Sequence, residues 1–198
     1  MLIGLTGRKR SGKSTAARYL VESYGFTELV LANELKSMAY DVNPVVGYDE
    51  ISGGVVPVYL AEVVDAYGWE AVKDLYPEAR RFLERLGTEG VRNHLGEDAW
   101  VDRVEPQIED IRSDDVHHRN GELTPIVVSD VRFENEAEMV VRNGGVIVEI
   151  NRIPAPPPPS DPHPSEQGVA WDYQIDNVTG KPEVLAIELD RLVRWLSR

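Results

Sequence analysis

The sequence predicts an α/β fold in which a mostly parallel five-stranded sheet carries helices on both faces, giving three layers. Short apolar runs typical of buried strands alternate with helical patterns along most of the chain. The first run leads through a glycine-rich turn straight into a helix, the unit from which parallel sheets are built. With 198 residues, 42% hydrophobic and 28% charged, the chain has the size and composition of a single globular domain, 1–198.

The glycine-rich turn fits the pattern G-x-x-x-x-G-K-[ST] at every fixed position from Gly7 to Ser14. Gly7 and Gly12 allow backbone conformations and close approaches that a Cβ would block. Lys13 can reach the β- and γ-phosphates of a nucleotide, and the Ser14 hydroxyl can ligate Mg²⁺. The pattern therefore predicts a phosphate-binding loop (P-loop) that uses ATP and Mg²⁺.

The context of this turn supports the same interpretation. An apolar run at 1–6 precedes it, and a helical pattern at 14–23 follows it, so backbone N–H groups and the positive end of the helix dipole face one point. A chance Gly/Lys/Ser turn is the alternative, but strand, turn and helix agree. The residues expected to hold the nucleotide are Gly7, Arg10, Ser11, Gly12, Lys13, Ser14 and Thr15.

After the first helix, the chain alternates between further patterns. We expect a second strand at 26–31, a short helix at 32–40, and a loop at 41–57 that contains Asn-Pro and Gly-Gly steps. Helical patterns follow at 58–67 (ending at Gly68), 69–75, 78–95 (with Pro77 in the first turn and Gly87 interrupting) and 97–108. An insertion of helices at about 41–112 is therefore predicted to bind substrate.

The α/β alternation then resumes. Strands are expected at 124–130, 146–150 and 173–176, and helices at 134–143 and 182–196. The segment 152–170 is too rich in proline for regular structure, and its place after a strand is typical of a lid. The four prolines at 156–159 favour a stiff, extended chain, which would be unusual in a lid.

One carboxylate stands where a predicted strand leaves the core. Asp130 ends the strand at 124–130, and ligands of parallel sheets gather at the carboxyl ends of strands. There it could hold Mg²⁺ through water or orient an acceptor group; the alternative is a helix N-cap. Arg132 and Glu136 follow at short spacing, so this segment presents both signs of charge to a cleft.

Several cations and one histidine admit two interpretations each. Arg81, Arg85 and Arg92 fall within roughly 40° of one another on an ideal helix, which suits phosphate binding, but Glu84 and Glu89 could pair with them as surface ions. Lys9 and Arg10 add positive charge beside the phosphates, whereas Lys36 is uninformative by itself. His163 could be a metal ligand or a base, although a lone loop histidine is usually neither.

The overall charge argues against some partners. The formal net charge is −13, so most of the surface would repel duplex DNA, while local Lys and Arg clusters could still bind a small anion. No apolar stretch approaches the roughly 20 residues needed to span a bilayer. With no cysteine and no signal peptide expected, we predict a cytoplasmic protein, in the host cytoplasm if a phage encodes it. The apolar helix at 58–67 fits either a core or a homodimer interface.

Taken together, the motifs resemble those of the phage-type deoxynucleoside monophosphate kinases, relatives of the adenylate-kinase-like P-loop kinases. The resemblance runs nearly end to end. It rests on Gly7-x-Lys9-Arg10-Ser11-Gly12-Lys13, Leu35-Lys36, Arg80-Arg81-Phe82-Leu83-x-x-Leu86-Gly87-Thr88-Glu89, Asp98-x-Trp100-Val101, Asp130-x-Arg132-x-x-x-Glu136 and His163-x-Ser165-Glu166. The chain departs from the family's pattern in the proline run and at Asn33-Glu34, where relatives often show Asp-Pro or Gly-Pro.

The resemblance implies transfer of the ATP γ-phosphoryl group to a deoxynucleoside 5′-monophosphate on a P-loop three-layer fold. It implies contacts to that substrate from Lys9, Leu35, Lys36, Arg81, Gly87, Thr88, Trp100, Asp130, Arg132 and Glu136, with Lys13, Arg132 and Asp130 at the reacting centre. A kinase of another phosphorylated metabolite and a non-catalytic nucleotide-binding protein remain alternatives. A GTPase is disfavoured because the chain has no Asn-Lys-x-Asp motif.

Overall fold

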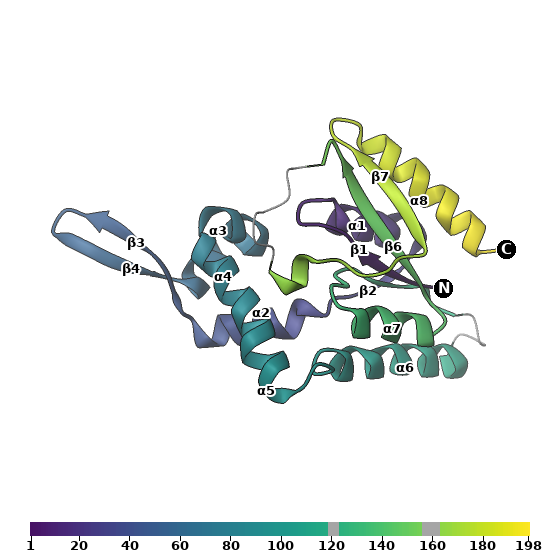
Figure 1. Cartoon of the computed structure of the whole chain (residues 1–198), viewed down its shortest axis with the longest axis horizontal. Coiled ribbons are helices and arrows are strands. Elements are labelled where there is room, and N and C mark those ends of the chain that lie inside the picture. The colour runs from purple at the N-terminus through teal and green to yellow at the C-terminus, as the bar shows by residue number, and fades with distance from the viewer. Residues whose placement is uncertain (119–122, 156–162) are drawn as a thin grey trace. The chain divides into compact units, whose positions relative to one another are not determined.

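The computed structural model describes residues 1–118, 123–155 and 163–198 (Figure 1). The chain divides into two compact units, Met1–Leu31 with Asp98–Arg198, and Ala32–Glu97. The second unit covers most of the insertion predicted at 41–112, and residues 98–112 fall in the first unit. The proline run at 156–159 lies outside the described residues.

The first unit is built on a five-stranded sheet with strand order β2-β5-β1-β6-β7, in which every pairing is parallel. The strands are β1 (Leu2–Thr6), β2 (Thr27–Leu29), β5 (Ile126–Val128), β6 (Val146–Ile153) and β7 (Tyr173–Val178). The predicted α/β fold with a parallel five-stranded sheet is therefore confirmed. Strand β1 is fully buried and pairs with β5 on one side and β6 on the other, so its carboxyl end opens at the centre of the sheet.

Two helices cover one face of this sheet, α1 (Lys13–Tyr24) and α8 (Pro182–Leu196). Because side chains alternate along a strand, Ile3 and Leu5 of β1 point to the same face. They join a buried cluster with Leu20 of α1 and Leu189 of α8, all fully buried. The helix predicted at 182–196 has the bounds of α8.

The other face is covered by α7 (Glu134–Arg142), with α6 (Val101–His118) beside it (Figure 1). Gly4 of β1 lies under α7, because a Cβ there would be 2.8 Å from Ile147 Cδ1 and 3.1 Å from Val140 Cγ2. Glu105 of α6 accepts two hydrogen bonds from the Arg142 guanidinium, at 2.8 and 2.5 Å. These bonds lower the pKa of the Glu105 carboxyl and tie the two helices together.

The second unit consists of helices and one hairpin. Its elements are α2 (Ala32–Val42), β3 (Val45–Ile51), β4 (Gly54–Tyr59), α3 (Leu60–Leu75), α4 (Pro77–Arg85), a π-helical segment (Leu86–Arg92) and α5 (Asn93–Leu95). A separate core that includes Leu60, Val72 and Leu83 holds them together. Helix α3 is kinked at Gly68, the residue at which the sequence predicted a helix end.

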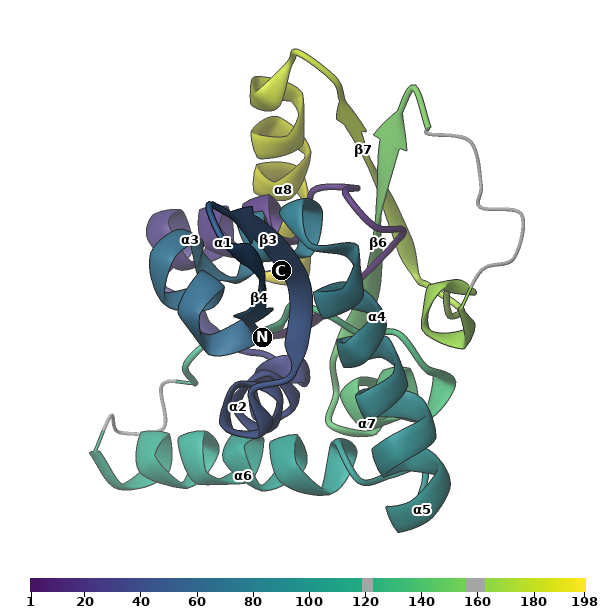
Figure 2. The ribbon, with the colours of Figure 1, turned by 90° about the vertical axis from the view of Figure 1, so that its left-hand side faces the viewer.

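The loop predicted at 41–57 is wrong, because most of it forms the antiparallel hairpin β3–β4 (Figure 2). Ser52 and Gly53 connect the strands and Gly54 begins β4, and Val, Ile and Tyr residues on either side favour extended chain. The insertion is therefore not entirely helical. Within the described part of the chain, no helix combines the length and the apolar character needed to cross a membrane.

Two tyrosines of α1 meet one carboxylate of α8. Tyr24 and Tyr19 donate hydrogen bonds of 2.7 and 2.8 Å to Asp190 Oδ1. Because these donors stabilise the ionised form, they lower the pKa of Asp190.

This cluster predicts a stability difference that depends on pH. A lowered pKa means that Asp190 contributes stability above its unfolded-state pKa, and that the contribution is lost as pH falls through the lower folded-state pKa. Asp190→Asn should reduce the melting temperature by a few degrees at pH 7, and the gap to wild type should close under acid conditions. Thermal melts followed by circular dichroism at pH 7 and below pH ~4 measure the gap. Glu188→Gln on the same helix is the control, and an equal gap at both pH values would contradict the assignment.

Candidate active site

The P-loop joins the carboxyl end of β1 to the first turn of α1, as the sequence predicted. Arg10 and Gly12 have positive φ values of 60° and 109°, and Gly7 has φ 126°. Helix α1 begins at Lys13, so its N-terminal N–H groups follow the loop directly. The loop thus has the conformation and the position that an anion cradle requires.

At Gly7 and Gly12, both the positive φ angle and the atoms close by favour glycine over any larger residue. A Cβ at Gly7 would lie 2.4 Å from the carbonyl oxygen of Ile150 on β6. A Cβ at Gly12 would lie 2.2 Å from Asn177 Nδ2 on β7. The loop therefore lies directly against the two strands that follow β1 in the sheet, and no larger residue fits at either position without a shift of the backbone or of Asn177.

Lys13 turns its side chain back into the loop. Its Nζ donates to the carbonyl oxygens of Gly7 at 2.6 Å and Arg8 at 3.0 Å. The ammonium group therefore lies over the loop that follows β1. There its positive charge adds to the partial positive charge of the helix N-terminus. Ser14 and Thr15 follow on the first turn of α1, and both are exposed.

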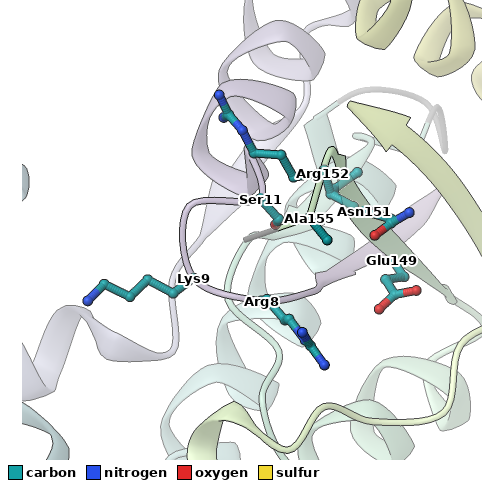
Figure 3. A pocket seen from close by; sticks show the side chains of 8 residues that line it. Arg8, Lys9, Ser11, Glu149, Asn151, Arg152 and Ala155 are labelled. Atoms are coloured by element: carbon teal, nitrogen blue, oxygen red, sulfur yellow. The ribbon is translucent and has the colours of Figure 1, made fainter. Parts of the chain in front are cut away.

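A pocket of about 300 Å³ opens between the loop and the end of β6 (Figure 3). Arg8, Lys9 and Arg152 line it together with Glu149, and the Lys9 side chain extends outward from the loop. Ser11 also lines the pocket but is only 2% exposed, and its hydroxyl has no hydrogen-bond partner among the described residues. The balance of charge along the wall suits a small anion.

Asp130 lies just beyond β5, the strand that pairs with β1 on the side away from β6. Its Oδ1 accepts a hydrogen bond of 2.9 Å from the backbone N–H of Leu31. The next residue, Val131, donates its N–H to Leu5 O at 3.0 Å, so this segment runs alongside the end of β1. Asp130 therefore lies near the carboxyl ends of the strands, where the sequence placed it, and its hydrogen bond to Leu31 also orders the chain after β2.

Arg132 and Glu136 are brought together at the N-terminus of α7. Glu136 is only 3% exposed, and its Oε2 accepts from the N–H groups of Arg132 at 2.7 Å and Phe133 at 3.1 Å. Arg132 is half-buried, and its guanidinium donates to Ser165 O at 3.3 Å. The contacts of Glu136 thus fix the turn that carries Arg132.

Trp100 and His163 also belong to the first unit. Trp100 precedes α6 and is 5% exposed, so its indole belongs to the core. Nδ1 of His163 is 2.9 Å from the Ser165 hydroxyl, next to the carbonyl that Arg132 contacts. His163 therefore orders the 3₁₀ turn Pro164–Glu166. Roles of these residues in binding stay predictions.

The other predicted substrate residues lie in the second unit, on α2, α4 and the π-helical segment. The structure brings two of the motifs together, because a Cβ on Gly87 would lie 3.0 Å from Leu35 Cδ2. Thr88 follows Gly87 and is half-buried. Lys36 follows Leu35 and acts on Lys73, whose pKa is lowered first by burial and further by Lys36 and Arg80, while the hydrogen bond to Glu70 opposes this shift.

Arg92 does not share a surface stripe with Arg81 and Arg85, which was one of the two arrangements that the spacing allowed. Arg92 is 8% exposed and donates to Glu97 O at 2.6 Å. The π-helical segment Leu86–Arg92 replaces the i→i+4 repeat that the spacing assumed, and this turns Arg92 inward. Arg81 is 67% exposed and forms an ion pair of 3.3 Å with Glu78, a partner that the sequence interpretation did not name.

Sequence reasoning missed two residues that hold the P-loop. Asn177 Nδ2 donates to Ser11 O at 2.7 Å, and Arg152 NH1 donates to Arg10 O at 3.3 Å. Their partners lie 166 and 142 positions away in the chain. Only the pairing of β6 with the sheet and of β7 with β6 brings them to the loop, so no local pattern could indicate them.

A parallel sheet whose central strand runs through a glycine-rich loop into a helix, with a lysine folded over that loop, defines a P-loop protein. No known family model matches the chain. A curated protein of Acanthamoeba polyphaga mimivirus, described as "Putative deoxynucleotide monophosphate kinase", is 30% identical over 181 residues, which cover 84% of this chain and 80% of that protein. The chain belongs to the deoxynucleotide monophosphate kinase family, and it is a kinase.

A crystal structure described as a "putative kinase" from Chloroflexus aurantiacus J-10-fl aligns over 99% of this chain and 93% of that one, with a TM-score of 0.43 and 13% sequence identity. A likeness at this level adds nothing to the assignment, which rests on the curated relative and on the P-loop itself.

Two glycine substitutions can separate the effect of a steric clash from the effect of an unfavourable φ angle on ligand binding. Gly12→Ala places a methyl group against Asn177 at a positive φ, so it should abolish the ATP binding that the sequence motif predicts. Gly25→Ala is the matched control, because Gly25 also has a positive φ of 69° but no atom lies within 4 Å of an added Cβ. It should cost stability of about 1–2 kcal/mol and leave ATP binding intact. Isothermal calorimetry and thermal melts measure both; normal ATP affinity in Gly12→Ala would contradict the described loop.

Proposed function

We propose that this kinase transfers the γ-phosphoryl group of ATP to a deoxynucleoside 5′-monophosphate and so forms the diphosphate. The observation that carries the proposal is the P-loop with Lys13 folded over its carbonyls, in a chain that belongs to this family. The loop offers a site for a polyphosphate, and the family relationship supports a nucleoside monophosphate as the acceptor. The donor and the acceptor are then both small anions.

The donor would be held by the loop and by the first turn of α1. Backbone N–H groups of the loop and of the first turn of α1, other than that of Ser11, would bind its phosphates together with the ammonium group of Lys13, and Arg10, Ser11 and Thr15 belong to that cradle. Ser14 supplies a hard oxygen on the exposed first turn, and the Asp130 carboxylate supplies another at the neighbouring strand end. Both suit Mg²⁺, which binds few protein oxygens and completes its shell with phosphate and water. The ion, when bound, neutralises charge on the transferred group.

The described residues fit this sparse kind of metal site. They contain no group of three or more His, Asp or Glu side chains arranged to hold a metal by themselves. Such a cage is unnecessary here, since the phosphates of the donor would provide most of the ligands. Ser14 and Asp130 are therefore the residues that we assign to Mg²⁺.

Residues of each unit are assigned to the acceptor separately in this proposal. In the first unit, Lys9 at the pocket wall and Arg132 at the start of α7 are assigned to the acceptor phosphate, and Trp100 to the rest of the acceptor. In the second unit, Arg81 on α4 is the cation assigned to the acceptor, with Leu35, Lys36, Gly87 and Thr88. Arg132 is half-buried on a turn that Glu136 fixes, so we assign Glu136 to positioning Arg132.

The reaction requires little acid–base chemistry from the protein. The acceptor oxygen belongs to a phosphate group that is already ionised at neutral pH, so no residue needs to remove a proton from it. Rate enhancement comes from alignment of the two phosphates and from charge stabilisation by Lys13 and Arg132. A net charge of −13 supports free nucleotides and not nucleic acid as the partner of this site.

Lys13→Ala tests the donor side. Removal of the ammonium group should lower the rate of phosphoryl transfer by about a thousandfold or more, with the fold intact. Arg18→Ala, an exposed cation on the same helix, should keep the wild-type rate. The measurement is a coupled assay of ADP formed from ATP and deoxynucleoside monophosphates, with melting temperature as the check on folding. Near-normal transfer by Lys13→Ala would remove this residue from the reacting centre.

Arg81→Ala tests the acceptor side. Because Arg81 is exposed and its ion pair with Glu78 is weak, its loss should cost little stability. The KM for the monophosphate should rise about tenfold or more, while the KM for ATP stays near wild type. Arg85→Ala, an exposed arginine on the same helix, is the matched control. An unchanged KM for the monophosphate in Arg81→Ala would exclude it from the acceptor site.

A further inference from the structure

One side chain of β6 and one side chain of β7 donate hydrogen bonds to backbone carbonyls of the P-loop. Arg152 of β6 and Asn177 of β7 are partners in the register of these parallel strands. Their side chains donate to consecutive carbonyl oxygens of the loop, Arg152 to Arg10 O at 3.3 Å and Asn177 to Ser11 O at 2.7 Å. Side chains of the sheet thus hold two carbonyl groups of the loop by hydrogen bonds.

The chemistry of the contact fixes the orientation of the Asn177 amide. A backbone carbonyl can only accept a hydrogen bond, so the NH₂ group and not the oxygen of Asn177 must face Ser11 O. A side chain with the same shape but no NH₂ group would place two acceptors against each other. Asn177 is therefore required here for its donor.

This contact determines where an N–H of the phosphate cradle points. In a planar trans peptide, the C=O of Ser11 and the N–H of Gly12 point in opposite directions. When Asn177 holds the carbonyl toward β7, the Gly12 N–H is directed away from the sheet, at the start of α1. Gly12 itself offers little resistance to rotation of this peptide, because glycine tolerates both signs of φ.

Ser11 does not hold the peptide by its own side chain. Its hydroxyl is buried and has no hydrogen-bond partner among the described residues, although Ser11 is only 2% exposed. The backbone N–H of Ser11 bonds within the loop, to Arg8 O at 3.1 Å. Of the described side chains, Asn177 is the one that contacts the Ser11 carbonyl and at the same time fills the space beside Gly12.

We infer that Asn177 is a positioning residue that sets the affinity of the P-loop for the polyphosphate of the donor by fixing the Ser11–Gly12 peptide. The inference rests on the proposed function, because it assumes that this loop binds ATP. Arg152 is the weaker arm of the same clamp. It also donates to Thr179 Oγ1 at 3.2 Å and lines the pocket, so its removal would mix several effects.

The test uses the full chain and an isosteric change. Asn177→Asp keeps the shape of the side chain but exchanges the NH₂ donor for an acceptor. Gln174→Glu is the matched control, since it makes the same change at an exposed position of the same strand, where the amide contacts Asp176 and not the loop. Isothermal calorimetry with Mg²⁺ measures the binding of ATP, of inorganic tripolyphosphate and of a deoxynucleoside monophosphate to each variant.

Asn177→Asp should bind ATP and tripolyphosphate about tenfold or more weakly than wild type, by the same factor, because one lost hydrogen bond and a new repulsion act on the phosphate cradle alone. Monophosphate binding should stay within about twofold of wild type, and Gln174→Glu should match wild type throughout. Equal ATP affinity in Asn177→Asp and wild type would overturn the inference, as would a loss for ATP without one for tripolyphosphate.

Two further observations keep the result interpretable. If Asn177→Asp does not fold by circular dichroism, Asn177→Ala removes the donor without adding charge, and the same three ligands decide the outcome. If wild type itself binds neither ATP nor tripolyphosphate, the proposed function fails and takes the role of Asn177 with it. Wild-type binding that survives in both Asn177 variants overturns the positioning role alone.

Discussion

The orientation of the peptide groups in the loop from Gly7 to Gly12 is the constraint on which the site depends. A short loop can point its N–H groups at an anion only if its carbonyls are held elsewhere. Here Lys13 takes the carbonyls of Gly7 and Arg8, Asn177 takes that of Ser11, and Arg152 takes that of Arg10. The register of β1, β6 and β7 brings Asn177 and Arg152 to the loop. The geometry of the phosphate cradle therefore depends on how the strands of the sheet pair.

Charge is distributed so that the site differs from the rest of the molecule. The chain carries a net charge of −13, yet three basic residues, Arg8, Lys9 and Arg152, are among those that line the pocket beside the P-loop. A small phosphate compound can respond to this local field, whereas an extended polyanion would meet the negative surface as well. The same contrast supports the proposal that free nucleotides are the ligands of this acidic protein.

The sequence predicts best what is local in the chain. The P-loop, the strands at its side and α8 follow from motif, apolar runs and helix signals, and the structure confirms them. The hairpin β3–β4 was missed because its Gly-Gly step was interpreted as loop punctuation. Arg92 was misplaced because a π-helical segment replaces the assumed helical repeat. The contacts of Asn177 and Arg152 could not be predicted, since they arise only when distant strands pair.

In the proposed reaction, the polyphosphate held by the P-loop gives its terminal phosphoryl group to a nucleoside monophosphate. The most direct measurement follows the label from γ-³²P-ATP after incubation of the wild-type chain with Mg²⁺ and each of dGMP, dTMP, dCMP and dAMP. If the proposed transfer takes place, label appears in at least one deoxynucleoside diphosphate. Label that stays in ATP with all four, or is released only as inorganic phosphate, would contradict it.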